Sequence, residues 1–264
     1  MQSLMRRKVT RIFIKASVSL ILILSLLTVF LYFGIQSFTF QTWLGKKASS
    51  YLSKELNADI SIQQIQLQFF KKAYLHGVKI LDLKQDTLLY GDILVDISNF
   101  NFRHQKLNLK TTELKNVTAK LITYKNDSVF NYQFIADYFT SDDKDSSIAK
   151  PWQIEYGNLL LNNVSFQYLN QNRQSTLTNH LNYDNLRFNE TYGKISNFKL
   201  LGDTISATIH QLKTKEHSGF VLNSFDAKVK LNSSRLFCED LKIVTPNSFI
   251  KSQLEFNYQK WEDY

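Results

Sequence analysis

The sequence predicts a mainly β protein that begins with one transmembrane helix and one short amphipathic helix and continues as an elongated antiparallel sheet. Three observations support this. Residues 16–33 carry no charge, residues 41–56 place apolar side chains at helical spacing, and from residue 57 onward apolar and polar residues alternate. The composition agrees, because 20 Phe and 13 Tyr among 264 residues favour the half-buried surface of strands.

The N-terminus carries a cluster of cations directly before the uncharged stretch. The first fifteen residues contain no Asp or Glu, and they include Arg6, Arg7, Lys8, Arg11 and Lys15. This cluster supplies +5 of the formal net charge of +9, which leaves +4 for the rest of the chain. Because most of the excess charge flanks an apolar stretch, it predicts a membrane topology and not nucleic-acid binding. We expect the N-terminus in the cytoplasm and the remainder exported.

The uncharged stretch has the length of a membrane-spanning helix. Together with the apolar residues 12–14 it reaches about twenty residues, or about 30 Å of helix, which matches the hydrocarbon core of a bilayer. A cleaved signal peptide would have a shorter apolar region and a small-x-small site, and residues 33–36 offer no such site. A buried core helix is the other alternative, and the preceding cations argue against it. We therefore expect an uncleaved single-pass anchor over residues 1–35, with Tyr32 and Trp43 at the outer interface.

Residues 36–57 are predicted to form an amphipathic helix, chiefly over 41–56. Leu44, Ala48, Leu52 and Leu56 recur at helical spacing, with lysines elsewhere on the surface. This helix is expected either to lie on the outer surface of the membrane or to pack on the sheet that follows.

Alternation with a period of two marks the predicted strands. Its clearest stretches are residues 60–62, 65–69, 93–97, 117–121, 164–168, 205–209 and 225–231. Turns between them are predicted mostly at asparagines, which adopt left-handed turn conformations nearly as readily as glycine. These are Asn99, Asn126, Asn162, Asn163, Asn170, Asn172 and Asn232. One short helix is predicted within residues 131–139.

Polar residues at 141–151 predict a loop between two β segments, 58–140 and 152–264. Strands and helices do not alternate regularly, which disfavours a doubly wound parallel sheet. Many strands at roughly ten-residue spacing with polar turns favour an antiparallel meander instead. The strand-like residues 254–258 would leave an open sheet edge, so the second segment is expected to be incomplete.

The sequence lacks the motifs of catalysis and of metal binding. Its five histidines form no HxH or HExxH pair, and no phosphate-binding loop or nucleophile elbow occurs. Residues 143–154 imitate the start of a calcium loop but lack its glycine and its final acidic residue. Cys238, the one cysteine, lies in an apolar stretch and is interpreted as a core residue. We expect no enzyme, no metal and no cofactor.

The alternating strands create one apolar face, which must be buried against another sheet, a helix or a ligand. An open trough lined by this face would suit acyl chains, whereas a closed sandwich would fill it with a protein core. The period of the alternation does not separate these two alternatives, and composition alone favours the sandwich.

In the order of its segments, the chain resembles the N-terminal part of the AsmA-like/TamB family, particularly members from Bacteroidota-type bacteria. The resemblance starts with the basic anchor and the helix that ends at residues 51–56, and it extends over nearly the whole chain. The other matching segments are 60–62, 77–82, 86–89, 131–139, 151–154, 202–205, 215–220 and 245–248. TamB-type members are several times longer, so the resemblance indicates a fragment or a truncated member.

Membership would imply an inner-membrane protein whose periplasmic sheet curls into a groove, open at its C-terminal edge, that takes part in phospholipid transport towards the outer membrane. The resemblance thus favours the groove over the sandwich and implies phospholipid acyl chains as ligands. It also leaves a second role open, that of an envelope assembly factor whose sheet edge meets an outer-membrane client or a β-barrel partner. We expect the groove to be lined by Ile60, Ile62, Ile93, Val95, Ile97, Phe225, Ala227 and Val229.

Overall fold

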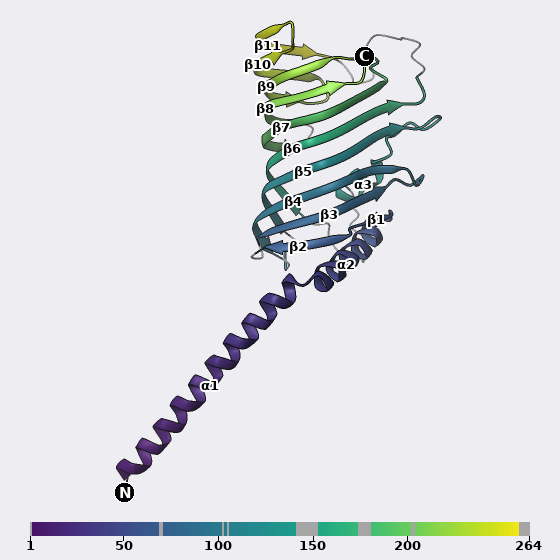
Figure 1. The fold of residues 1–264 in the computed structure, drawn as a ribbon. Helices are drawn as coiled ribbons and strands as arrows, with labels where there is room; N and C mark the ends of the chain where they lie inside the picture. Colours follow the sequence, from purple (N-terminus) through teal and green to yellow (C-terminus); the bar gives the residue numbers. More distant parts are fainter. Residues whose placement is uncertain are drawn as a thin grey trace.

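Three helices and one large sheet make up the computed structural model, which describes residues 2–68, 71–101, 103–104, 106–140, 153–173, 181–201 and 204–258 (Figure 1). Helix α1 spans Gln2–Gln36, α2 spans Phe38–Leu56 and α3 spans Gln133–Thr140. In Figure 1, α1 projects away from the sheet, and its segment Ser17–Gln36 is long and apolar enough to cross a membrane. The predicted apolar helix at the N-terminus is therefore confirmed.

The strands follow one another through the sheet almost in chain order. They are β1 (Ile60–Ser61), β2 (Gln64–Gln68), β3 (Lys72–Leu81), β4 (Thr87–Asn101), β5 (Lys106–Thr123), β6 (Gln153–Asn170), β7 (Asn185–Leu201), β8 (Thr204–Glu216), β9 (Val221–Leu231), β10 (Arg235–Val244) and β11 (Phe249–Asn257). The order in the sheet is β1-β3-β4-β5-β6-β7-β8-β9-β10-β11, and β2 also pairs with β3. The mainly β fold class is confirmed, with a strand at each stretch that the alternation marked.

One strand pair departs from the predicted antiparallel meander. Strands β5 and β6 run parallel, whereas every other pairing in the described sheet is antiparallel. A parallel neighbour requires a long crossover that returns the chain to the same end of the sheet. The described part of the connection between β5 and β6, residues 124–140, contains α3, and the two predicted β segments belong to one continuous sheet. The polar residues 141–151 lie outside the described residues.

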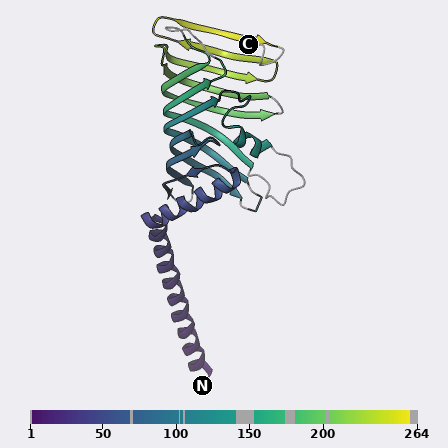
Figure 2. The ribbon, with the colours of Figure 1, turned by 90° about the vertical axis from the view of Figure 1, so that its right-hand side faces the viewer.

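The sheet curls but does not close into a barrel, as the two perpendicular views show (Figures 1 and 2). Its two ends are the β1 and β2 edge beside α2 and the β11 edge at the far end of the stack. A single curled sheet forms, and no second sheet faces it among the described residues. The open alternative therefore holds over the sandwich.

Bulges on successive strands bend the sheet. The register shifts at residues in the left-handed region, where one strand carries an extra residue, and such bulges raise the local twist and bend a strand. Residues of this kind are Gly77, Asn116, Asn163, Glu190, Gln211 and Asp240. Asn163 and Asn116 lie beside each other, and the Asn163 Nδ2 donates to Asn116 Oδ1 at 2.7 Å. The prediction that Asn99, Asn162 and Asn163 mark turns is thus wrong, because Asn99 lies within β4 and the other two lie within β6.

Helix α2 packs on the first strands and covers the N-terminal edge of the sheet, as one of its two predicted placements required. Gly45 lets the helix approach closely, since a Cβ there would lie 2.9 Å from the carbonyl oxygen of Ile62. Two serines one helical turn apart satisfy the free backbone groups of this edge. The N–H of Ile62 donates to Ser49 Oγ at 2.7 Å, and the N–H of Ile60 donates to Ser53 Oγ at 3.0 Å. An edge capped in this way is protected from pairing with other chains.

Replacing both Ser49 and Ser53 by alanine should destabilise the protein, because two buried N–H groups lose their acceptors. Each orphaned donor costs about 1–3 kcal/mol. Urea unfolding of the full chain in mild detergent, followed by circular dichroism, measures this loss. Ser50→Ala is the matched control, since Ser50 lies between the two serines and is exposed. Equal stabilities of the double variant and this control would show that α2 does not cap the edge through its hydroxyls.

Candidate functional site

The strand registers place apolar residues from all parts of the sheet on one face, which we call the apolar face. Residues directly opposite each other on neighbouring strands share a face. One row of partners crosses seven strands and contains a single polar member. It consists of Ala73, Val95, Thr112, Leu159, Ile195, Ile209 and Ala227. A second row, formed by Ile65, Leu75, Ile93, Leu114 and Leu161, lies on the same face.

Six of the eight predicted lining residues lie on β4 and β9, at separate places along this face. Ile93 and Val95 belong to the two rows, and Ile97 pairs with Leu109 on β5. On β9, Ala227 ends the first row, while Phe225 and Val229 pack with the buried Ala227, Cys238 and Leu241. The structure therefore brings these two trios to one face but leaves four strands between them.

The other two predicted residues, Ile60 and Ile62, lie beneath α2. They are 5% and 4% exposed, and Ile62 packs in a core with Ile65, Ala73 and Val78. Leu44, Ala48 and Leu52 of α2 pack against this core. A protein helix thus covers the part of the apolar face at which these two residues lie.

Sequence reasoning missed the central part of the face, on β5 to β8. Its members there include Leu114, Leu159, Leu161, Ile195 and Ile209. Residues 159–161 are three consecutive leucines, which hide the period of two, and Leu160 pairs with Lys194 on the opposite face. The spacing of two residues between Leu159 and Leu161, and between Ala207 and Ile209, is the signal that could have identified this part of the face.

Beyond β5 no described helix packs on the apolar face. Several of its side chains there are buried by their neighbours on the sheet, whereas others, such as Ile205 on β8, are exposed. Ala227 and Cys238 are 3% and 4% exposed. At the far end every residue of β11 is exposed, and Phe249 is 62% exposed. At β6 the ring of Phe130, from the crossover, lies 5.8 Å from that of Tyr168, and the apolar face is open from β7 to β11 in the described part of the chain.

The opposite face of the sheet is polar and solvated. Lys228 Nζ lies 2.7 Å from Asp240 Oδ2 and 3.7 Å from Glu239 Oε2, and all three side chains are exposed. Lys215 Nζ lies 2.7 Å from Glu190 Oε2. Exposed pairs of this kind contribute little to stability. The two faces of the sheet therefore differ in polarity.

Neither a metal cluster nor a reactive cysteine occurs in the described residues. No group of three or more His, Cys, Asp or Glu side chains there could hold a metal ion. Cys238 lies on the apolar face opposite Val229 and Leu254, and burial raises the pKa of its thiol, so the neutral thiol predominates. Of residues 143–154, which imitate the start of a calcium loop, residues 143–152 lie outside the described residues.

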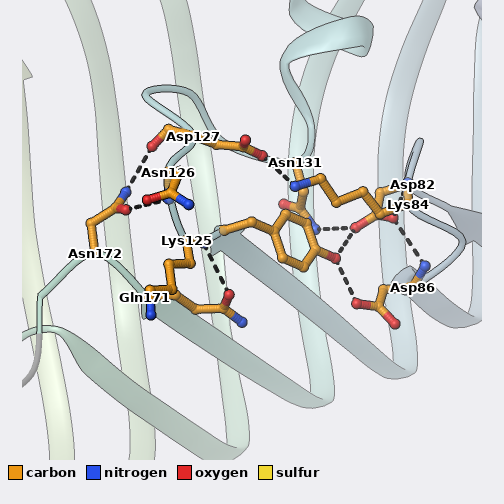
Figure 3. A network of polar contacts seen from close by, with 10 residues as sticks. Asp82, Lys84, Asp86, Lys125, Asn126, Asp127, Asn131, Gln171 and Asn172 are labelled. Carbon is orange, nitrogen blue, oxygen red and sulfur yellow. Dashed lines mark hydrogen bonds and ion pairs between the residues drawn. The ribbon is translucent and has the colours of Figure 1, made fainter.

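A polar network ties together the strand ends along one side of the sheet (Figure 3). The buried carboxylate of Asp82, at the β3–β4 turn, accepts hydrogen bonds from Tyr124 Oη at 2.6 Å and from Asn131 Nδ2 at 3.0 Å. It also accepts from the backbone N–H groups of Lys84 and Asp86. The crossover that leads to α3 is thereby fixed to the turn between β3 and β4.

The same network extends to the residues that follow β6. The N–H of Lys125 donates to Gln171 Oε1 at 3.1 Å, and the N–H of Asn126 donates to Asn172 Oδ1 at 2.7 Å (Figure 3). Because β5 and β6 are parallel, their C-terminal ends lie on the same side of the sheet. These contacts join the residues that follow the two strands.

Protonation states in the network follow from its hydrogen bonds. Burial acts to raise the pKa of Asp82, but the bonds from Tyr124, Asn131 and two backbone N–H groups outweigh it and lower the pKa. Burial and the hydrogen bonds to Asp82 and Asp86 raise the pKa of Tyr124 strongly. The carboxylate therefore stays charged and the phenol stays a donor.

Asp82→Asn should lower the free energy of unfolding by about 1–3 kcal/mol at neutral pH, because the charged acceptor is lost. A lowered folded-state pKa means that the carboxylate stabilises the fold above its ordinary pKa, and that this stabilisation is lost as pH falls through the folded-state value. The unfolding free energies of the two proteins, measured in urea, should therefore differ most at pH 7, begin to approach each other below about pH 4, and converge only below the folded-state pKa of Asp82.

Asp127→Asn is the control, because the Asp127–Lys84 ion pair of 2.7 Å is exposed and should contribute less than about 1 kcal/mol. A difference between wild type and Asp82→Asn that stays constant from pH 7 to pH 3 would contradict the assignment of a charged Asp82.

The predicted topology signal lies at the start of α1. Arg6, Arg7, Lys8 and Arg11 lie in its first turns, and Lys15 lies two residues before the segment Ser17–Gln36. Tyr32 lies near the end of that segment, and Trp43 is exposed on α2.

Comparisons with known proteins add no assignment: no protein-family model matches the chain, and neither a curated protein nor a solved structure is found to match it.

Proposed function

We propose that this protein is anchored in the inner membrane by α1 and carries phospholipid acyl chains on the apolar face of a periplasmic sheet, as part of phospholipid transport towards the outer membrane and of cell-envelope biogenesis. The observation that carries the proposal is the continuous apolar face of an open, curled sheet, which no described helix or strand covers from β7 to β11. The membrane-spanning length of Ser17–Gln36 supports the anchor.

The dimensions of the sheet suit an acyl chain. Neighbouring strands lie about 4.8 Å apart, so the eight intervals from β3 to β11 extend over about 38 Å. One leaflet of a bilayer has an acyl region of about 15 Å, half of the 30 Å hydrocarbon core. An acyl chain could therefore lie wholly on the sheet and away from the membrane.

The transfer free energy of an acyl chain favours reversible binding over permanent binding. Removing an acyl chain from water stabilises a complex by about 0.8 kcal/mol for each buried CH₂ group. A lipid that moves from the bilayer to the apolar face exchanges one apolar environment for another, so most of this free energy cancels. Exchange with the bilayer is therefore feasible, and binding keeps the chain out of water during movement.

Native mass spectrometry of the full chain, purified in mild detergent, tests the proposal. We expect co-purified phospholipid on most molecules. A full chain that is free of phospholipid under several mild extraction conditions, while its circular dichroism shows a folded sheet, would overturn it.

A second candidate function rests on the far edge of the sheet. Strand β11 pairs with β10 alone among the described strands, and all nine of its residues are exposed. An exposed strand edge can pair with a strand from another protein. An envelope assembly factor would use it to hold an outer-membrane client or a β-barrel partner. Photo-crosslinking from β11 in intact cells would then recover a β-barrel protein, whereas lipid transport alone predicts no such product.

A further inference from the structure

A cavity of about 630 Å³ lies where the end of α1 meets the polar face of the first strands. Eight of its strand residues form two neighbouring rows of partners on the face opposite to the apolar face, and Leu67, Ala73 and Val95 lie between these rows in the strands. The rows are Gln66, Tyr74, Leu94 and Glu113, and Gln68, Lys72, Asp96 and Thr111. Thr111 and Glu113 line the cavity and the intervening Thr112 does not, which identifies the face.

The cavity lies where the membrane-spanning segment ends. Its helical wall is formed by Tyr32, Phe33 and Gln36, and Gln36 is the last residue of Ser17–Gln36. Gln36 Nε2 donates to the carbonyl oxygen of Leu67 at 3.2 Å, which holds this end of α1 to strand β2. If α1 crosses a bilayer, the cavity therefore lies at the level of the lipid headgroups, where aromatic side chains such as Tyr32 are favoured.

The charges in the cavity are arranged as one cation and two carboxylates. Lys72 and Asp96 are direct cross-strand partners, and Glu113 lies diagonally across from Asp96. None of these three forms an ion pair with another described side chain. Glu113 Oε1 accepts one hydrogen bond, from Asn162 Nδ2 at 2.9 Å. The charges are thus available to a ligand that carries both signs.

We propose that this cavity binds the phosphoethanolamine headgroup of a phospholipid in the leaflet in which α1 ends. Lys72 would contact the phosphate, Asp96 and Glu113 would accept hydrogen bonds from the primary ammonium, and Tyr32 and Phe33 would contact the glycerol and the first methylene groups. This site deepens the proposed function, since it rests on membrane insertion of α1 and selects the lipid class at the base of the sheet.

The carboxylates of Asp96 and Glu113 favour one class of phospholipid headgroup over the others. A primary ammonium has three N–H donors for them, whereas a trimethylammonium group has none. A phosphoglycerol headgroup carries a net negative charge, and Asp96 and Glu113 repel it. One charge-assisted hydrogen bond in a half-buried site is worth about 1 kcal/mol, which corresponds to about a fivefold preference for phosphatidylethanolamine over phosphatidylcholine.

Native mass spectrometry of the full chain tests this site. The protein is equilibrated in mild detergent with equimolar phosphatidylethanolamine, phosphatidylcholine and phosphatidylglycerol, and the bound lipid classes are counted. Wild type should retain phosphatidylethanolamine at least about fivefold over the other two. The double variant Asp96→Asn with Glu113→Gln should bring the ratio to phosphatidylcholine close to one. Lys72→Gln, at an exposed position, should lower phosphatidylethanolamine retention and keeps the test valid if the double variant does not fold.

Glu239→Gln, which removes an exposed carboxylate on the same polar face at β10, should leave the ratio unchanged. Soluble phosphoethanolamine added at the lipid concentration should not displace the lipid, and full displacement would show that the free headgroup is the ligand. Unchanged ratios in both the double variant and Lys72→Gln, with total bound lipid unchanged, would overturn the headgroup site and leave the proposed function standing. A wild-type chain that retains no lipid of any class would overturn both.

Discussion

Replacing Ile209 by glutamate should remove most of the bound phospholipid, whereas the same replacement at Thr208 should leave it in place. Ile209 lies in the middle of the apolar face, between Ile195 on β7 and Ala227 on β9. A charge on a lipid-contacting surface costs about 2 kcal/mol or more, so lipid occupancy should fall by a factor of about 30. Native mass spectrometry of the full chain in mild detergent measures the occupancy.

Thr208 is the matched control because it is the preceding residue on the same strand and points to the opposite face. Its partners are Ser196 and Lys228, and a glutamate there adds the same charge beside a lysine. Circular dichroism should show a folded sheet for both variants. Equal lipid loss in both, or equal retention in both, would contradict a specific role for the apolar face.

Replacing all five N-terminal cations by glutamine should invert the orientation of the protein in most molecules. The cluster Arg6, Arg7, Lys8, Arg11 and Lys15 precedes the membrane-spanning segment, while Lys46 and Lys47 follow it closely in α2. Without the cluster, the excess of positive charge lies on the other side, and the side with more Lys and Arg tends to stay in the cytoplasm.

Alkaline phosphatase fused to the C-terminus reports this orientation, because it is active only after export. Activity should fall by about an order of magnitude in the five-residue variant if most molecules insert the other way. Lys46→Gln with Lys47→Gln is the control and should keep full activity, since the original cluster remains. Full activity in the five-residue variant would show that another feature sets the topology.

The helices and most strands of this fold could be predicted from local patterns. The uncharged stretch at 16–33 and the helical spacing at 41–56 correspond to α1 and α2, although α2 begins earlier, at Phe38, where Ser37 caps it. Ser37 Oγ accepts from the N–H of Phe40 at 3.3 Å, a local contact that apolar spacing does not reveal. Strands in which apolar and polar residues alternate without interruption, such as β9, could be predicted equally well.

The parallel pairing of β5 and β6 could not be predicted, because it depends on contacts far apart in the chain. Asp82 and Tyr124 are 42 residues apart, and Lys125 and Gln171 are 46 apart, yet these pairs fix the crossover. Turns were wrongly predicted at Asn162 and Asn163 for a related reason. A left-handed residue produces a turn or a bulge depending on whether the strand continues beyond it, and Asn163 continues into a paired strand.

Of the apolar face, the alternation in the sequence identified residues on β4 and β9 but not those on the strands between them. Ile93, Val95, Ala227 and their neighbours follow a visible alternation, whereas the leucines at 159–161 form a continuous run. The role of Ile60 and Ile62 beneath α2 depends on Gly45, whose small size permits the close approach of helix and strand. Neither the sequence period nor composition contains that information.

Site-specific photo-crosslinking along β8 and β9 tests the central claim most directly. A benzophenone amino acid is placed, one position at a time, at Ala207, Thr208, Ile209, Ala227 and Lys228 in the full chain in cells, and adducts are identified by mass spectrometry. The registers place Ala207, Ile209 and Ala227 on the apolar face and the other two on the polar face. We predict phospholipid adducts at the first three positions and none at Thr208 or Lys228. Equal adduct yields on both faces, or only protein adducts from the apolar face, would contradict a lipid-carrying sheet.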